Sequence, residues 1–124
     1  YKEQILAGRS IRCVVILTEA CTGKPPSHMS PYVTAKYALM GFAKTMAAEL
    51  ERYGCTVNMI SPGMVDTDLL KDFPAKAVEL AAAQNPSREI AKPEDVAHVV
   101  SFLVSDAAAH LNGVNLTLNR KEVI

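Results

Sequence analysis

Two side chains that could exchange a proton stand one helical turn apart in the first third of the chain. Tyr32 and Lys36 lie four residues apart in the segment Y-V-T-A-K, so both should project from one face of a helix. With the ammonium about 4–5 Å from the phenol oxygen in a partly dry site, Coulomb attraction favours the phenolate by roughly 3–4 kcal/mol at a dielectric constant near 20. Such a tyrosine can protonate a carbonyl oxygen or deprotonate an alcohol. The spacing also arises by chance, so it indicates chemistry only together with the elements around it.

The segment Pro31–Tyr53 is predicted to be the helix that carries this pair. Ser30 suits the N-cap, and Pro31 suits the first helical position because its missing N–H group leaves no bond unmade. Strong helix formers fill the interior, and Gly54 predicts the end. Small or apolar residues on most faces predict burial on more than one side. Gly41 predicts close approach of a second helix, from the same subunit or from another copy.

Strands are predicted on both sides of this helix. Ile11–Thr18 is a β-branched apolar run, which favours a parallel strand buried on both faces, and Cys55–Ser61 is predicted to be the second strand. The helix between them suits a crossover connection. Pro93 is predicted to open a later helix, and Val114–Leu118 the last strand. Strands and helices that alternate in this way indicate an α/β fold.

The segment Glu19–Met29 is predicted to be a loop, since it combines glycine, adjacent prolines and small polar residues. In doubly wound sheets the loops beyond the carboxyl ends of the strands line the ligand crevice. Ala20, Thr22 and His28 are therefore candidate residues of a substrate pocket. For His28, a solvated loop position is the favoured alternative.

Composition argues against several other classes of function. The formal charge is zero and no basic patch occurs, which disfavours nucleic acid and anionic membranes as partners. No apolar run reaches the 18 or so residues of a membrane span, and no signal peptide is visible. The 3 cysteines lack metal-ligand spacing, and neither His98 nor His110 has a metal-binding arrangement around it. We therefore predict reduced thiols, no metal site and a cytoplasmic location.

Longer motifs resemble one enzyme family. The Y-V-T-A-K helix followed by V-N-M-I-S-P-G-M-V-D-T-D, and later K-P-E-D-V-A-H-V-V-S-F-L-V-S-D, resembles the C-terminal half of short-chain dehydrogenases/reductases. The similar proteins are of the compact type typified by 3-oxoacyl-[acyl-carrier-protein] reductases, and the resemblance runs from about Arg9 to Leu118. It implies part of a doubly wound, Rossmann-like parallel sheet. Because no glycine-rich phosphate loop occurs, residues 1–124 are expected to be the C-terminal half of one NAD(P)-binding domain, with the cofactor-phosphate half upstream.

The resemblance also implies roles for particular residues. Tyr32 would act as general acid/base in carbonyl reduction or alcohol oxidation, and Lys36 would hold the cofactor ribose. The implied cofactor is NAD or NADP, with NADP slightly favoured, and the remaining cofactor-binding positions are Pro62, Gly63, Val65 and Thr67. For Thr67, the alternative is an N-cap on the short helix Asp68–Lys71. Segment 66–88 is expected to form a lid over a small carbonyl or alcohol substrate, and helix 31–53 to form a homodimer or homotetramer.

Three departures from the family pattern leave a second hypothesis open. The serine that relatives usually carry 12–13 residues before the tyrosine is replaced, because those positions hold Ala20 and Glu19. Loss of one oxyanion donor typically costs about 10²–10³ in rate. The tail after Leu118 lacks the usual Gly-Gly, and the phosphate loop is missing. The alternative is a non-catalytic relative that keeps the fold for assembly or binding.

Overall fold

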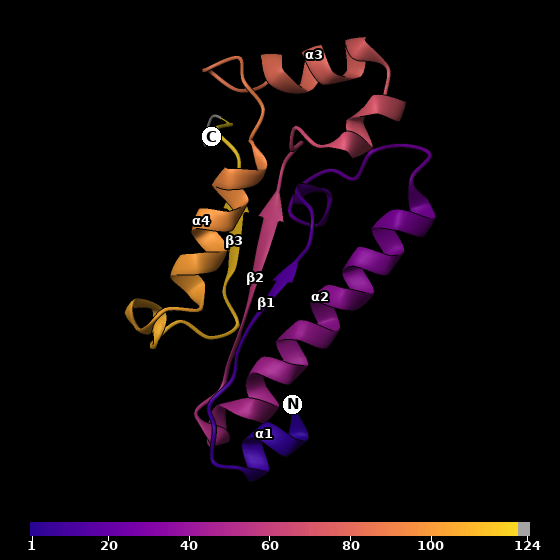
Figure 1. Ribbon diagram of the computed structural model, residues 1–124. Helices are drawn as coiled ribbons and strands as arrows, with labels where there is room; N and C mark the ends of the chain where they lie inside the picture. Colours follow the sequence, from indigo (N-terminus) through magenta and orange to yellow (C-terminus); the bar gives the residue numbers. More distant parts are fainter. Residues whose placement is uncertain (122–124) are drawn as a thin grey trace.

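The computed structural model describes residues 1–121, which form a parallel sheet with helices on both of its faces (Figure 1). The strands are β1 (Arg12–Ile16), β2 (Thr56–Pro62) and β3 (Asn115–Leu118), in the spatial order β1-β2-β3. Because all three run parallel, their carboxyl ends lie along one edge of the sheet. The predicted α/β class and all three predicted strands are confirmed, with bounds shifted by one or two residues.

Helix α2 (Ser30–Leu50) crosses one face of the sheet between β1 and β2. A 3-10 turn over Glu51–Tyr53 extends it, and Gly54 ends it in the left-handed conformation with φ of 67°. The predicted N-cap is wrong by one residue. Met29 occupies the cap position without a side-chain cap hydrogen bond, and Ser30 is already helical.

The other helices are α1 (Lys2–Leu6), α3 (Ala75–Ala83) and α4 (Pro93–Leu103). Pro93 opens α4 as predicted, and the backbone N–H of Lys92 donates to the Asp95 carboxylate at 2.7 Å. Figure 1 shows α3 beyond the carboxyl ends of the strands, at the top of the molecule. A 3-10 segment, η3 (Asp68–Asp72), precedes it, and Pro74 separates the two as the N-cap of α3.

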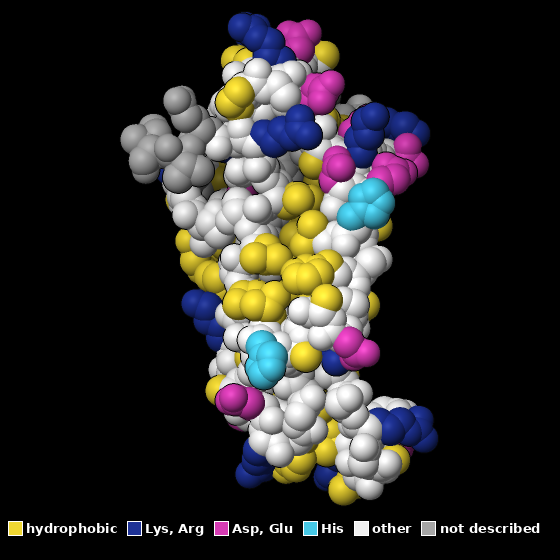
Figure 2. Space-filling view, turned by 90° about the vertical axis from the view of Figure 1, so that its left-hand side faces the viewer, with side chains coloured by type: hydrophobic (Ala, Val, Ile, Leu, Met, Phe, Trp, Pro, Cys, Tyr) yellow, Lys and Arg dark blue, Asp and Glu magenta, His cyan; other side chains and the backbone are white. Residues whose placement is uncertain are grey.

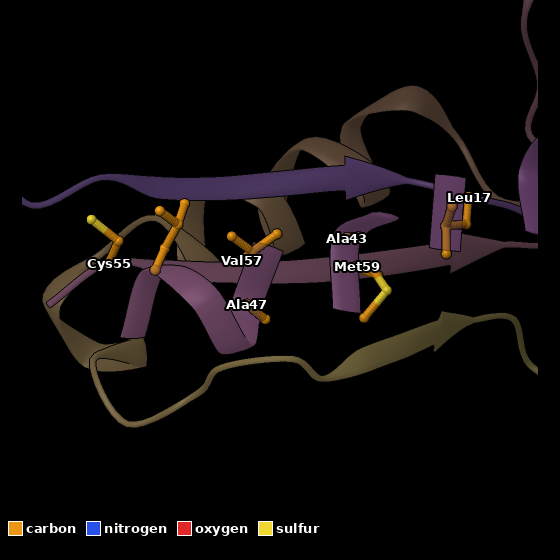
Figure 3. Packing of buried hydrophobic residues seen from close by; sticks show 7 residues of the cluster. Leu17, Ala43, Ala47, Cys55, Val57 and Met59 are labelled. Atoms are coloured by element: carbon orange, nitrogen blue, oxygen red, sulfur yellow. The ribbon is translucent and has the colours of Figure 1, made fainter. Parts of the chain in front are cut away.

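Side chains of β2 alternate between two cores, one under each layer of helices. Val57 and Met59 face α2 and pack with Ala43 and Ala47, as Figure 3 shows at close range. Ile60 faces the opposite side and packs with residues that include Leu103 and Ala108. Burial on both faces explains why apolar side chains of β2 point to both sides of the sheet.

Polar side chains inside this sheet tie β2 to the loop that enters β3. Asn58 is fully buried; its amide donates to the carbonyl of Leu111 at 2.9 Å and accepts from the N–H of Val114 at 3.2 Å. Ser61, also fully buried, donates to the Asn115 side chain at 2.8 Å. These satisfied groups fix the position of β3 beside β2.

Two predictions of burial are not met within this chain. Strand β1 lies at the edge of the sheet, and its residues Cys13 and Ile16 are exposed, so β1 is not buried on both faces. Helix α2 buries only the side that rests on the sheet. At the end of α4, Phe102 and the cap residue Val104 are exposed, whereas Leu103 between them is buried. Figure 2 shows this α4 side of the molecule, with hydrophobic side chains across its middle and most charges toward its two ends.

Candidate active site

The first two turns of α2 hold Tyr32 and Lys36 at the carboxyl end of β1. The Lys36 ammonium donates to the backbone carbonyl of Ile16, the last residue of that strand, at 3.0 Å. The same Nζ lies 5.9 Å from the centroid of the Tyr32 ring. Tyr32 is 43% exposed, so its ring borders solvent. The structure thus brings the two side chains together on one helix face, where the ammonium links the tyrosine to the strand end.

A buried thiol lies near the same ammonium. Cys21 belongs to the 3-10 segment η1 (Glu19–Cys21), which follows β1. Burial raises the pKa of the Cys21 thiol, while the positive charge of Lys36 acts in the opposite direction. The thiol is therefore protonated near neutral pH.

Local hydrogen bonds occupy the hydroxyl groups around Ala20, which is itself buried in η1. The Thr18 hydroxyl caps η1 and accepts from the N–H of Ala20 at 3.4 Å. The Thr22 hydroxyl donates its single proton to the carbonyl of Glu19 at 2.8 Å. In this arrangement the Thr22 hydroxyl can accept a hydrogen bond from a ligand but cannot donate one. His28, the third predicted pocket residue, is exposed and has a left-handed backbone with φ of 63°.

The turn after β2 packs closely against its neighbours. Pro62 ends the strand in a buried position, and the N–H of Gly63 donates to the carbonyl of Leu118 at 3.0 Å. A Cβ atom at Gly63 would lie 3.2 Å from Oε2 of Glu19 and 3.5 Å from Cβ of Asn119. Gly63 is absent from the glycines with positive φ, so close approach rather than left-handed backbone explains the glycine.

Beyond the turn, the chain is held to the segment before α4. Val65 pairs with Ala91 in an isolated parallel bridge, and the N–H of Asp66 donates to the Ala91 carbonyl at 2.8 Å. Thr67 occupies the N-cap position of η3, but its side chain makes no cap hydrogen bond. Thr67 therefore occupies the predicted N-cap position, but its exposed hydroxyl makes no capping hydrogen bond.

Sequence reasoning missed an acidic residue at the centre of the strand ends. The Glu19 carboxylate accepts from Nζ of Lys121 at 2.8 Å and from Nδ2 of Asn119 at 3.0 Å. The available signal was its place three residues after the end of β1 and 13 residues before Tyr32. The partners, about 100 residues away in sequence, carried no signal of their own.

Within residues 1–121, no group of three or more His, Cys, Asp or Glu side chains is arranged to hold a metal ion. All 3 cysteines are free thiols. Among the helices of this described part, none has the length and apolar character needed to cross a bilayer.

Comparison with known proteins relates nearly the whole chain to one group of enzymes. The family described as enoyl-(acyl carrier protein) reductase matches residues 4–120. The 3-oxoacyl-[acyl-carrier-protein] reductase of Pseudomonas aeruginosa is 36% identical over 88 residues, which cover 71% of this chain and 36% of that protein. A short chain dehydrogenase/reductase of Aspergillus oryzae is 32% identical over 110 residues, covering 86% of this chain and 42% of that one.

A solved structure shows the same arrangement. Levodione reductase superposes with a TM-score of 0.83 at 28% identity, over 95% of this chain and 48% of its own. The chain thus spans less than half the length of each of these relatives. The parallel sheet, the match over residues 4–120 and the Y-V-T-A-K helix agree, and the chain belongs to the short-chain dehydrogenase/reductase family of oxidoreductases.

Proposed function

We propose that the full-length protein reduces carbonyl groups or oxidises alcohols with NAD(P), and that Tyr32 is its general acid/base. The observation that supports this most is the position of Lys36. Its ammonium lies beside the Tyr32 ring and also binds the carbonyl at the end of β1. In open α/β sheets, ligands bind in the crevice outside these strand ends. A proton-exchanging side chain is thereby held beside a fixed cation where a substrate can enter.

The chain's own residues would move the proton. In reduction, the Tyr32 hydroxyl donates to the carbonyl oxygen of the substrate, and in oxidation the phenolate accepts the proton of the alcohol. The Lys36 ammonium attracts the negative charge that develops on the tyrosine oxygen. Because an ammonium has three N–H groups and the Ile16 carbonyl engages one, the others can bind the ribose hydroxyls of a nucleotide.

The residues after β2 fit a nicotinamide nucleotide. Gly63 leaves no side chain in the turn, Val65 lies on backbone fixed by Ala91, and the Thr67 hydroxyl is not consumed by the cap. Pro62, Gly63, Val65 and Thr67 would hold the nicotinamide side of the cofactor, and NADP is slightly favoured by family resemblance. When bound, this cofactor supplies or accepts the hydride. Residues 1–124 then form the C-terminal half of the NAD(P)-binding domain.

The substrate would be a small carbonyl compound or alcohol beneath α3. This helix has no buried residue and lies over the strand ends in Figure 1, as a lid does. Ala20, Thr22 and His28 would border the pocket. Further proposals are a cytoplasmic location and a homodimer or homotetramer formed through helix 31–53.

The test compares Tyr32→Phe with the wild-type full-length protein in oxidation of NADPH or NADH by a small β-ketoester. Loss of the acid/base should lower kcat by about 10²–10⁴-fold. Tyr37→Phe is the matched control, because Tyr37 is on the same helix and similarly exposed. Equal rates for Tyr32→Phe and wild type would overturn the proposal.

One observation favours a second candidate, a non-catalytic member kept for assembly or binding. Ala20 has no hydroxyl, and the Thr22 proton is bound to Glu19, so no serine-like donor replaces it at this point of η1. The same assay separates the two candidates. A wild-type protein that never oxidises either nicotinamide cofactor supports the non-catalytic role.

A further inference from the structure

We propose that Glu19 is a positioning residue for the turn at Pro62–Gly63, which it ties to the segment that follows β3. This inference rests on the proposed function, since the turn matters for catalysis only if it holds the nicotinamide. The carboxylate meets all three strand ends. It follows β1, lies against Gly63 after β2, and binds Asn119 and Lys121 after β3.

Each carboxylate oxygen of Glu19 has a separate donor. Oε1 accepts from Nζ of Lys121 at 2.8 Å, and Oε2 accepts from Nδ2 of Asn119 at 3.0 Å. The N–H of Lys121 donates in turn to the Asn119 side chain at 3.3 Å, which folds this short segment back on itself. Asn119 thereby orients Lys121 as well as binding the carboxylate directly.

Burial distinguishes this ion pair from the two others among residues 1–121. The Glu19 and Lys121 side chains are 28% and 35% exposed, whereas Asp106 in the Arg12 pair is fully exposed, as are most of Asp68 and Lys71. Exposed pairs contribute little because water and salt screen them. A shielded pair with a second charged hydrogen bond holds its geometry more firmly.

The contact with Gly63 explains how this network would act on the turn. Oε2 lies where a side chain on residue 63 would begin, so the carboxylate fills the space that the glycine leaves. The Gly63 N–H is bound to Leu118, the residue just before Asn119. Glu19 and this backbone bond together hold the turn against the end of β3. If the carboxylate loses its partners, the turn can shift, and a shift of about 1 Å in a binding group can cost up to 10²-fold in rate.

The experiment measures NADPH binding and steady-state kinetics of the full-length protein carrying Glu19→Gln or Lys121→Met. Both variants remove the ion pair and should weaken NADPH binding and raise its KM by about tenfold, with a smaller change in KM for the β-ketoester. Asp106→Asn is the matched control, because it removes a 2.8 Å ion pair with Arg12, which lies at the opposite, amino-terminal end of β1. Its cofactor KM should stay at the wild-type value.

Non-additivity provides the decisive comparison. If the Glu19–Lys121 contact positions the turn, the double variant that carries Glu19→Gln and Lys121→Met should have the same NADPH affinity as the single variant that binds NADPH more weakly. Wild-type NADPH affinity in both single variants, or losses that multiply in the double variant, would overturn the inference. The proposed function fails separately, when wild type itself neither binds nor oxidises a nicotinamide cofactor, or when Tyr32→Phe retains full activity.

Discussion

A methyl group at Ala20 stands near the place where relatives of this type usually carry a serine hydroxyl. Restoring that donor should raise the rate of ketone reduction, by at most the 10²–10³-fold that one oxyanion donor is worth. We therefore expect Ala20→Ser to increase kcat for a β-ketoester in the full-length protein. Glu19→Ser changes the other position at the family spacing and should lower the rate, because it removes the carboxylate that holds the Pro62–Gly63 turn. A gain in Glu19→Ser alone would show that the register runs through residue 19 and that our assignment of Ala20 is wrong.

The Cys21 thiol makes a pH-dependent contribution to stability. Because burial raises its pKa above the ordinary value of 9.0, the folded state favours the protonated thiol. This contribution is fully present below pH 9 and is lost as the pH rises through the raised pKa, since the unfolded chain releases the proton more readily. We expect wild type to lose more free energy of unfolding between pH 8 and 10.5 than Cys21→Ala, measured by urea denaturation. Cys13→Ala, which removes an exposed thiol, should behave like wild type.

At the residue scale, local chemistry could be predicted and distant contacts could not. Tyr32 and Lys36 are one turn apart, so helical geometry alone brings them together. Glu19 and Lys121 are brought together by the sheet, which places the ends of β1 and β3 on either side of Gly63. No pattern in the sequence predicts such an ion pair before the order of the strands is known.

Two glycines of the α2 region should respond oppositely to alanine. Gly54 has φ of 67°, where an L side chain costs about 1–2 kcal/mol, so Gly54→Ala should destabilise the fold. Gly41 lies inside α2 with open space around its Cβ position, so Gly41→Ala should stabilise it by about 1 kcal/mol. Thermal and urea unfolding of both variants measure this. Destabilisation by Gly41→Ala would indicate that another helix packs there, as the sequence had suggested.

At the scale of helices and strands, boundaries were predicted correctly where a single residue restricts its own backbone. Gly54 ends α2, Pro93 opens α4 and Pro74 separates η3 from α3, because each residue constrains its own backbone. The N-cap prediction at Ser30 failed because Ser30 is already the first helical residue and Met29 occupies the cap position. The burial of Asn58 in β2 could not be predicted. Its amide is satisfied by backbone groups of Leu111 and Val114, which are more than 50 residues away in sequence.

At the scale of the whole molecule, two layers of helices bury β2 while the outer surfaces stay open. The parallel direction of the strands follows from the helical crossover connections that the alternation of elements predicts, whereas the order β1-β2-β3 comes from the structure alone. The exposure of β1 does not follow, because a β-branched run looks the same at an edge as in the centre of a sheet. The sequence alone therefore predicts that helices pack on a sheet better than it predicts which faces of those helices and strands remain exposed.

The uncovered face of α2 leads to a prediction about assembly. Phe42 is 59% exposed on this helix, next to Gly41 and five residues beyond Tyr37, which is also exposed. Aromatic side chains are enriched at the interfaces between protein molecules. If copies of the protein associate there, Phe42→Glu would place a charge in the interface and should weaken self-association of the full-length protein by tenfold or more. Sedimentation velocity over a range of protein concentrations measures the effect.

Phe102→Glu introduces the same change at an exposed phenylalanine of α4, on the opposite face of the sheet, and should leave the oligomer intact. Dissociation by Phe102→Glu alone would place the interface on α4 and contradict the assignment to α2.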